Sequence, residues 1–317
     1  MRFRFILICA LAAGIHAHAE DFPSRQIKMV VPFAPGASTD VLARLIGDKL
    51  RARWGQPVIV ENRGGDGGNI GAAEVFHAKP DGYTLLVSPP STLVINKSLY
   101  GKLNYDSEQF VPVTVIGTVP TVLVVHPKLD ANTVNELIAL LKANPERLNY
   151  ASQGNGSTAQ LTTEMFKSKA GVKIVHVPYK GAAPALTDLV AGHVDMMFAN
   201  LASALPLIRS RQVKAIGVAS EKRNSLLPGV STMSEVLPGF VSETWIGMVA
   251  PPNTPSEIAR KISGAVADAL KLPEVGKVFA DLSADPVGST PAETAAFVKL
   301  EGERWGGVIR SSGAKAE

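Results

Sequence analysis

Two short stretches of small and hydroxyl-bearing residues, far apart in the chain, have the composition of an anion-binding loop. The first, Pro32–Asp40 (PFAPGASTD), follows an apolar run and precedes residues with helical spacing. The second, Ser152–Thr158 (SQGNGST), has the same setting. The first turn of a helix carries unpaired backbone N–H groups and a partial positive charge, and small residues let a ligand approach them. Both stretches therefore predict binding of a carboxylate or phosphate, although a plain turn between strand and helix has a similar composition.

Residue patterns typical of catalysis or metal binding are lacking in the sequence. There is no G-x-S-x-G motif, no P-loop lysine and no close pair of carboxylates. The stretch Gly154–Ala159 fits the dinucleotide pattern G-x-G-x-x-A, but its position in mid-chain argues against a nucleotide. The histidines lack the spacing of zinc ligands: His77, His126, His176 and His193. We therefore predict a binding protein, not an enzyme, without cofactor or metal. An exported hydrolase with a spatially assembled triad is the alternative.

The first 19 residues have the features of a secretory signal peptide. Arg2 and Arg4 precede the apolar run Phe5–Ala13, and Ala17-His18-Ala19 has the small-x-small pattern of a cleavage site, so we expect cleavage after Ala19. That run is too short to span a membrane stably. The only cysteine, Cys9, lies in this segment, so the mature chain is expected to contain no disulfide. The prediction is an exported protein.

The size and charge of the chain exclude several other classes. Its 317 residues are 46% hydrophobic, enough for about two domains with sizeable cores. The formal net charge is +4. Cleavage would remove two arginines and leave 30 basic and 28 acidic residues, a net charge of +2. Because there is no basic run and no basic stripe with aromatic residues, we expect no nucleic-acid partner.

The anion-binding loops require strands and helices to position them, and these alternate in two series followed by a helical tail. This alternation predicts parallel β-α units. The expected strands are Ile27–Val31, Val58–Glu61, Tyr83–Val87, Val122–Val125, Leu148–Ala151, Lys173–Val177, Asp195–Phe198 and Val213–Ala219, with an extended run at Ser242–Val249. The expected helices are Asp40–Arg53, Ala72–Ala78, Val134–Ala143, Ala159–Lys169 and Ala183–Ala191. Two tail helices are expected after the capping motifs at Thr254 and Thr290, with at most a short strand between them.

The natural arrangement of these elements is an α/β fold with two open, mostly parallel sheets. The chain is expected to cross between the sheets near Thr121–Leu123 and return near Glu243–Ile246. In open sheets ligands bind beyond the carboxyl ends of the strands, where the strand order reverses. Small-residue loops follow six of the expected strands at that end, so one cleft between two domains is the expected site. The predicted division is 20–121 plus 246–317 for one lobe and 122–245 for the other.

The chain resembles the periplasmic solute-binding receptors of tripartite tricarboxylate transporters, often called the Bordetella uptake (Bug) proteins. Six stretches carry the resemblance, in the family's order and over nearly the whole mature chain. They are Pro32–Asp40, Val58–Ala72 (VIVENRGGDGGNIGA), Asp81–Leu86 (DGYTLL), Asn149–Ser157 (NYASQGNGS), Val177–Leu189 (VPYKGAAPALTDL) and Gly192–Phe198 (GHVDMMF).

The resemblance implies a fold, a location and a mode of binding. The fold would be the two-lobed, type II clam-shell of periplasmic binding proteins, with a hinge and a small organic carboxylate between the lobes. The carboxylate would be held mainly by backbone amides and ordered waters of the loops Ala34–Asp40 and Ser152–Thr158. The receptor would be a periplasmic monomer that transiently contacts the membrane subunits of its transporter. A ligand sensor that signals to a membrane partner is the alternative.

Ligand contacts are expected from loops at the strand ends. The first loop contributes Phe33, Ala34, Pro35, Gly36, Ala37, Ser38 and Thr39. The second contributes Ser152, Gly154, Asn155, Gly156, Ser157 and Thr158. Further contacts are expected from Gly68, Ser88, Ser91, Thr92, Tyr179, Lys180, Ala199 and Asn200.

Some of these residues have an alternative structural role. Ser38 or Thr39 can cap the helix that follows as well as contact the ligand, and Lys180 can be solvated. Asp40 is expected to be structural, because a carboxylate would repel an anionic ligand while stabilising the helix dipole.

Three positions depart from the family pattern. Ala37 stands where a second glycine is usual, Gln160 lies near a common histidine, and Ala199 lies near a common aspartate. The missing carboxylate at Ala199 would remove a partner for a ligand ammonium group. We therefore expect a carboxylate without an amino group, either aromatic or a di-acid.

Overall fold

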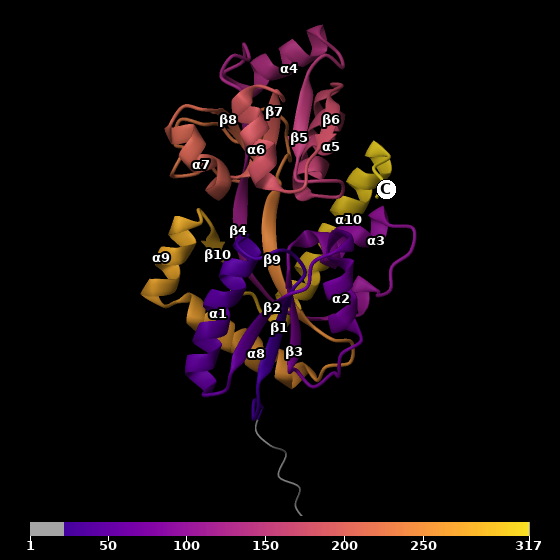
Figure 1. The fold of residues 1–317 in the computed structure, drawn as a ribbon, viewed down its shortest axis with the longest axis vertical. Helices are drawn as coiled ribbons and strands as arrows, with labels where there is room; N and C mark the ends of the chain where they lie inside the picture. The colour runs from indigo at the N-terminus through magenta and orange to yellow at the C-terminus, as the bar shows by residue number, and fades with distance from the viewer. Residues whose placement is uncertain (1–21, 317) are drawn as a thin grey trace, which may run out of the picture.

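The computed structural model describes residues 22–316, and the predicted signal peptide lies outside these residues. Two α/β lobes lie one above the other, and two long strands run between them (Figure 1). We call the half that contains β1 the first lobe and the half that contains β5 the second lobe. The two-lobed α/β prediction is confirmed.

The first lobe is built around a parallel sheet in which β1 lies between β2 and β3. Its strands are β1 (Ile27–Val31), β2 (Val58–Asn62) and β3 (Thr84–Ser88). The helices from this part of the chain are α1 (Ser38–Trp54), α2 (Asn69–Phe76) and α3 (Asn96–Leu99), with short turns η1 (Asp66–Gly68), η2 (Ser91–Ile95) and η3 (Ser107–Gln109). The tail returns to this lobe as α8 (Ser256–Leu270), α9 (Pro273–Asp281), β10 (Asp285–Pro286) and α10 (Pro291–Ser312).

The second lobe also has a three-stranded parallel centre, in which β5 lies between β6 and β7. Its strands are β5 (Asn149–Ser152), β6 (Val175–Pro178), β7 (Met196–Asn200) and β8 (Lys214–Val218). Its helices are α4 (Val134–Ala143), α5 (Thr158–Ala170), α6 (Ala182–Ala191) and α7 (Leu201–Arg209), with the turn η4 (Met233–Glu235).

One strand belongs to both sheets. β4 (Val111–Val125) pairs antiparallel with β9 (Glu243–Ala250) in the first lobe, and from Thr121 onward it pairs antiparallel with β7 and β8. The two sheets are therefore mixed and continuous, an arrangement beyond the two separate sheets expected from the sequence. β4 changes partners at Pro120–Thr121, close to the expected crossing. That the lobes move about this point stays a prediction.

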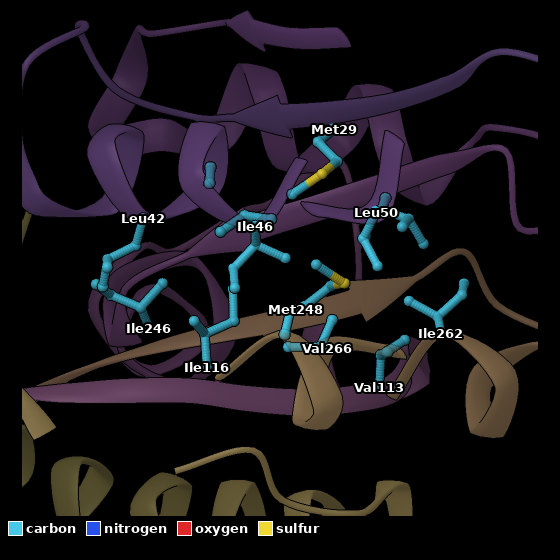
Figure 2. Packing of buried hydrophobic residues seen from close by; sticks show 14 of the residues in the cluster. Met29, Leu42, Ile46, Leu50, Val113, Ile116, Ile246, Met248, Ile262 and Val266 are labelled. Atoms are coloured by element: carbon cyan, nitrogen blue, oxygen red, sulfur yellow. The ribbon is translucent and has the colours of Figure 1, made fainter. Parts of the chain in front are cut away.

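The core of the first lobe forms because α1 presents an apolar stripe to the sheet. Leu42, Ile46 and Leu50 recur every four residues and are fully buried. They pack against side chains of the strands and of α8, as Figure 2 shows. Their labelled neighbours are Met29, Val113, Ile116, Ile246, Met248, Ile262 and Val266. Each buried side chain of this size stabilises the fold by about 1.5–3 kcal/mol, so α1 is held firmly with its N-terminus at the end of β1.

A buried carboxylate fastens α10 to β9. Glu301 is 8% exposed and accepts hydrogen bonds from the indole N–H groups of Trp245 (2.8 Å) and Trp305 (3.1 Å) and from Nη2 of Arg304 (2.8 Å). Arg304 also donates to the carbonyl of Val241, just before β9. α10 is thereby fixed to the strand that crosses between the lobes.

Several local predictions are wrong. η2 and α3 make Ser91–Leu99 helical, although the two prolines before it suggested a loop; Pro90 precedes the first turn, where its missing N–H costs nothing. α7 was not predicted because it contains Pro206, and α9 lies in a stretch with no expected helix. Thr254 does not cap α8, since its hydroxyl donates to the carbonyl of Pro251. The capping box at Thr290 is confirmed.

Replacing Glu301 with alanine is expected to lower the free energy of unfolding by about 2–4 kcal/mol, because two buried indole N–H groups and Arg304 lose their shared acceptor. Urea unfolding followed by tryptophan fluorescence measures this loss. The control is Glu303→Ala, an exposed acid on the same helix, which is expected to change stability by less than about 0.5 kcal/mol. Equal stabilities of the two variants would contradict the assigned role.

Candidate functional site

A cleft of about 1240 Å³ is lined by residues of both lobes. Four of its walls are loops that lead into helices: Phe33–Thr39 before α1, Gln153 and Asn155–Thr158 before α5, Lys180–Ala183 before α6, and Asn200 with Ala202–Ser203 at the start of α7. The first comes from the first lobe and the other three from the second. The two loops singled out in the sequence thus line one shared cleft.

Three of these four helices have no side-chain cap at the N-terminus. The N-cap residues are Ala37 for α1, Gly181 for α6 and Asn200 for α7, and none accepts a capping hydrogen bond. In α5, the hydroxyl of Ser157 caps the backbone N–H of Gln160. Helices that begin without a cap present their first N–H groups and the positive end of their dipole to whatever lies in front of them. Here the cleft lies in front of all of them.

The charge of the lining favours an anion as well. Among the described residues that line the cleft, Lys180 is the only one with a charged side chain, and none is an acid. Helix N-termini and a lysine therefore give the cleft a positive potential. Cations have no charged partner among these lining residues.

Asp40 holds the first loop in shape from behind. Its Oδ2 accepts from the backbone N–H of Gly36 (2.9 Å), and its Oδ1 accepts from Nδ2 of Asn62 (3.0 Å) and pairs with Nη2 of Arg44 (2.9 Å). Asn62 also donates to the carbonyl of Phe33 (3.0 Å). The expected structural role of Asp40 agrees with this geometry. Gly36 has φ +92°, which suits glycine at this tight bend.

The electrostatics of Asp40 follow from these partners. Burial alone would raise its pKa, but the hydrogen bonds from Arg44, the amide of Gly36 and Asn62, together with the charge of Arg44, outweigh burial and lower the pKa. Asp40 is therefore ionised at neutral pH. Asp40 is only 4% exposed and is not among the residues that line the cleft.

The expected capping role of Ser38 and Thr39 is wrong. Both are already helical residues of α1, and the N-cap is Ala37. Asp40, in the first turn of the helix, accepts from the loop amide of Gly36 and so fixes the loop, but the first N–H groups of the helix have no side-chain cap. Ser38 and Thr39 instead line the cleft.

Gln160 and His176 hold the second loop. Oε1 of Gln160 accepts from the backbone N–H of Gly156 (2.6 Å), and its Nε2 lies 3.4 Å from Nδ1 of His176. Nε2 of His176 lies 2.7 Å from the hydroxyl of Ser152, which in turn contacts Gly154. The histidine ring stacks on Tyr150. From the sequence, Gln160 is only a departure from the family pattern, and His176 has no predicted role.

Most predicted contacts lie on the cleft wall. Those that line it are Phe33, Ala34, Pro35, Gly36, Ala37, Ser38, Thr39, Ser91, Asn155, Gly156, Ser157, Thr158, Lys180 and Asn200. Those outside the lining are Gly68, Ser88, Thr92, Ser152, Gly154, Tyr179 and Ala199. Whether the lining residues touch a ligand stays a prediction.

The residues outside the lining have partners behind it. The hydroxyls of Ser88 and Thr92 bond to each other (2.6 Å) and are buried. Tyr179 donates to Asp188 (2.7 Å), and burial together with this carboxylate raises the pKa of the tyrosine to about 12. Ala199 is 1% exposed in the core of the second lobe. We therefore consider these residues supports of the wall.

Another part of the cleft wall was not expected from the sequence. α6 and α7 contribute apolar side chains, and Thr244 of β9 also lines the cleft and donates its hydroxyl to Oδ1 of Asn200 (3.1 Å). The apolar residues are Pro184, Leu186, Val190, Pro206 and Leu207. α7 was not expected because proline usually ends a helix and Pro206 lies inside this one, so its apolar side chains were not expected in the wall.

Two classes of site have no counterpart in the described part of the chain. Within residues 22–316, His, Cys, Asp and Glu side chains do not gather in any group of three or more suited to a metal ion. Nor does any helix in this range have the length and apolar character to cross a membrane.

Comparison with known proteins identifies similar chains. A family model described as the tripartite tricarboxylate transporter family receptor matches residues 42–314. Protein BugT of Bordetella pertussis is 40% identical over 98% of this chain and 96% of its own length. Rpa4515 of R. palustris, in a structure with adipate, is 36% identical with a TM-score of 0.84, covering 93% of this chain and 99% of that one. MatC of Rhodopseudomonas palustris, with bound malate, is 35% identical with a TM-score of 0.80, covering 91% and 100%.

Replacing Asp40 with asparagine is expected to lower the free energy of unfolding at pH 7 by about 1–2 kcal/mol, because a charged acceptor of three groups is lost. The stabilisation from a carboxyl with a lowered pKa is present above its ordinary value of 3.8 and disappears as the pH falls through the lowered value. The two proteins should therefore converge in urea unfolding under strongly acidic conditions. Asp48→Asn, at an exposed position of α1, serves as the control; a pH-independent difference would refute the assignment.

Proposed function

The chain belongs to the tripartite tricarboxylate transporter receptor family, and we propose that it captures a small organic carboxylate between its lobes and presents it to the membrane subunits of such a transporter. Receptors of this family are periplasmic solute-binding proteins. The proposed location is thus the periplasm, after cleavage behind Ala19. We expect the receptor to act as a monomer.

One observation carries this proposal: N-termini of helices from both lobes face one cleft that contains no acid in its described lining. A carboxylate placed there would accept hydrogen bonds from the first-turn N–H groups of α1 and, at the same time, from those of α5 that the Ser157 cap leaves free. Because these groups belong to different lobes, the ligand would favour the closed form by binding it more tightly than the open one. Many amides and waters would share the binding, without an arginine clamp.

The ligand class follows from the lining. A ligand ammonium group would find no carboxylate among the lining residues, which argues against amino acids. This replaces the sequence argument from Ala199, whose side chain lies in the core. Adipate and malate, found with two similar proteins, are di-acids without an amino group. The apolar face of α6 and α7 would cover the body of an aliphatic or aromatic acid. We therefore propose an aliphatic di-acid first and an aromatic acid second.

The proposed lobes comprise residues 20–121 with 246–317, and residues 122–245. The change of partners of β4 at Pro120–Thr121 and the start of β9 at Glu243 support these boundaries. Closure would bend β4 and β9 where they leave the first sheet. The hydrogen bond between Thr244 and Asn200 would keep the start of α7 aligned with the hinge strand.

A thermal-shift panel tests the ligand class. Adipate, malate and benzoate are compared with aspartate and glutamate. At saturating concentration, a di-acid is expected to raise the melting temperature by several degrees, because ligand binding to the native state alone stabilises it by about 2–4 kcal/mol. Mass spectrometry should recover the acid unchanged. Tight binding of aspartate or glutamate in calorimetry, with no response to simple carboxylates, would refute the proposed class, and consumption of the acid would favour the hydrolase.

A charge at the N-terminus of α1 separates binding from folding. Ser38→Asp is expected to abolish the thermal shift by adipate, since the new carboxylate would occupy the anion position and repel the ligand. The same change should leave unliganded stability unaltered or higher, because an acid suits a helix N-terminus. Ser38→Asn, of similar shape and neutral, is the matched control and should retain most of the shift. Retention of full binding by Ser38→Asp would contradict this site.

Gln160→Ala is expected to weaken binding of the panel acid about tenfold in calorimetry, because the amide of Gly156 would lose its acceptor and the second loop its fixed shape. The melting temperature without ligand should fall by only a few degrees. Gln109→Ala, at an exposed site of the first lobe, provides the comparison. An unchanged affinity would show that this brace does not prepare the loop for binding.

A further inference from the structure

One wall of the cleft is formed by η2 and α3 of the first lobe, which follow β3 in the chain. Three residues of this segment line the cleft: Ser91 at the start of η2, Asn96 at the start of α3, and Tyr100 just after α3. The four residues between Ser91 and Asn96 are buried and lie outside the lining. A row of three polar residues thus faces the cleft from a segment that is otherwise part of the interior.

The backbone of η2 explains how this row forms. η2 is one turn of π-helix, in which the N–H of Asn96 donates to the carbonyl of Ser91, five residues earlier. The N–H of Tyr100 then donates to the carbonyl of Asn96 (2.9 Å), with the α-helical spacing of four residues. Residues joined in this way lie above one another on one helix face. An ordinary α-helix would place the apolar Ile95 above Ser91 instead. Single π-helical turns occur frequently at functional sites.

Asn96 and Gly67 fix the position of the Tyr100 side chain. Nδ2 of Asn96 donates to the carbonyl of Gly67 (3.1 Å) and to Oδ1 of Asn69 (2.6 Å), which attaches the row to η1. Gly67 lines the cleft and has φ +60°. Because it has no side chain, the phenolic oxygen of Tyr100 lies directly against it, where a Cβ would collide with that oxygen. The hydroxyl of Tyr100 is thereby held at the cleft wall.

Two hydroxyl groups of the row have hydrogen-bonding capacity that the described chain does not use. The hydroxyl of Tyr100 makes no hydrogen bond to any group of residues 22–316, and the buried oxygen of Ser91 likewise has no partner there. Tyrosine hydroxyls in apolar surroundings usually find a partner. Burial and the charge of Asp66 raise the pKa of Tyr100 above the ordinary 10.0, so its hydroxyl keeps the proton at neutral pH. Since Tyr100 is only partly buried, a ligand can reach it more readily than Ser91.

The residue before Tyr100 places this wall beside the second loop. A Cβ on Gly156 would collide with a methyl group of Leu99, so the end of α3 touches the second lobe at this glycine. Gly156 lines the cleft and directly precedes Ser157, the N-cap of α5. Tyr100 therefore lies next to the place where the two lobes meet at the N-terminus of α5.

We propose that Tyr100 is a side-chain donor to the bound acid, whose carboxylate accepts a hydrogen bond from the phenol beside the helix N-termini. This inference rests on the proposed function. A carboxylate has about four acceptor positions, so it can accept from the amides of α1 and α5 and from a hydroxyl together. The phenol supplies this hydrogen bond without a charge, and its rigid side chain loses little freedom when it is ordered. Because Tyr100 belongs to the first lobe and α5 to the second, the acid also links the lobes through this contact.

Calorimetry with adipate tests the contribution of the hydroxyl. Tyr100→Phe removes this group alone and is expected to weaken the affinity about tenfold, because a hydrogen bond to a charged acceptor is lost. The melting temperature without ligand should stay within about a degree of the wild-type value, since the hydroxyl has no partner within residues 22–316. An affinity of Tyr100→Phe equal to that of the wild type would overturn the proposal.

Tyr83→Phe is the matched control. Tyr83 precedes β3, at the end of the sheet away from the cleft, and its hydroxyl contacts Ser24. Loss of this hydroxyl should leave the affinity for adipate unchanged. An equal loss of affinity in Tyr83→Phe and Tyr100→Phe would show a general effect of removing a tyrosine hydroxyl and would overturn the specific role of Tyr100.

A crystal structure of the complex with adipate separates direct contact from an indirect effect. Oη of Tyr100 should lie within about 3 Å of a carboxylate oxygen. A separation beyond hydrogen-bond distance would overturn the proposal even when Tyr100→Phe binds weakly. If adipate does not bind the wild type, the acid of the panel that binds replaces it in both experiments. Failure of every panel acid to bind the wild type would count against the proposed function, whereas a bound acid out of reach of Tyr100 would count against this residue alone.

Discussion

The structure depends on backbone N–H groups that the fold leaves without side-chain acceptors at one place. α1 of the first lobe and α6 and α7 of the second begin without a cap, and all begin at the cleft. A helix end in a protein interior ordinarily finds a serine, threonine or aspartate to accept from its first turn. Here alanine and glycine stand at two of those positions, and the third, Asn200, accepts from Thr244 instead of capping its helix. An anion from outside the chain is therefore the natural partner. An arginine would give more charge, but it would also have to be ordered and desolvated on closure.

Such donors are useful only if their loops keep one shape, and the protein achieves this with polar side chains placed behind them. Asp40 accepts from the amide of Gly36, and Gln160 accepts from the amide of Gly156. These two contacts have the same form: a side chain in the first turn of the helix accepts from a glycine amide of the preceding loop. The glycine amides are thereby occupied, which leaves the first-turn amides of the helices as the donors directed to the cleft. The two lobes differ in sequence, yet each fixes its loop with an equivalent side-chain contact. This equivalence supports the proposal that both loops bind the same carboxylate group of the ligand.

This division between donors and supports explains what could be predicted from the sequence. The loops, their strands and the lining role of Ala37 and Asn155 depend on local composition and period, which are visible in a single chain. The supports depend on tertiary partners: Ser88 and Ser152 have the composition of contact residues, yet they bond to Thr92 and His176 behind the wall. α7 and η2 were not found because prolines that usually end a helix occur inside one and before the other. The partnership of β4 with both sheets also could not be predicted, because a valine-rich stretch such as Val111–Val125 does not indicate where a strand changes neighbours.

β4 and β9 impose a last constraint, which joins the fold to the binding event. Since one strand belongs to both sheets, the two lobes are joined through it, and we expect any relative movement to be absorbed where β4 changes partners and β9 begins. α10 limits that movement further, because Glu301 and Arg304 attach it to Trp245 and to the carbonyl of Val241, on either side of Glu243.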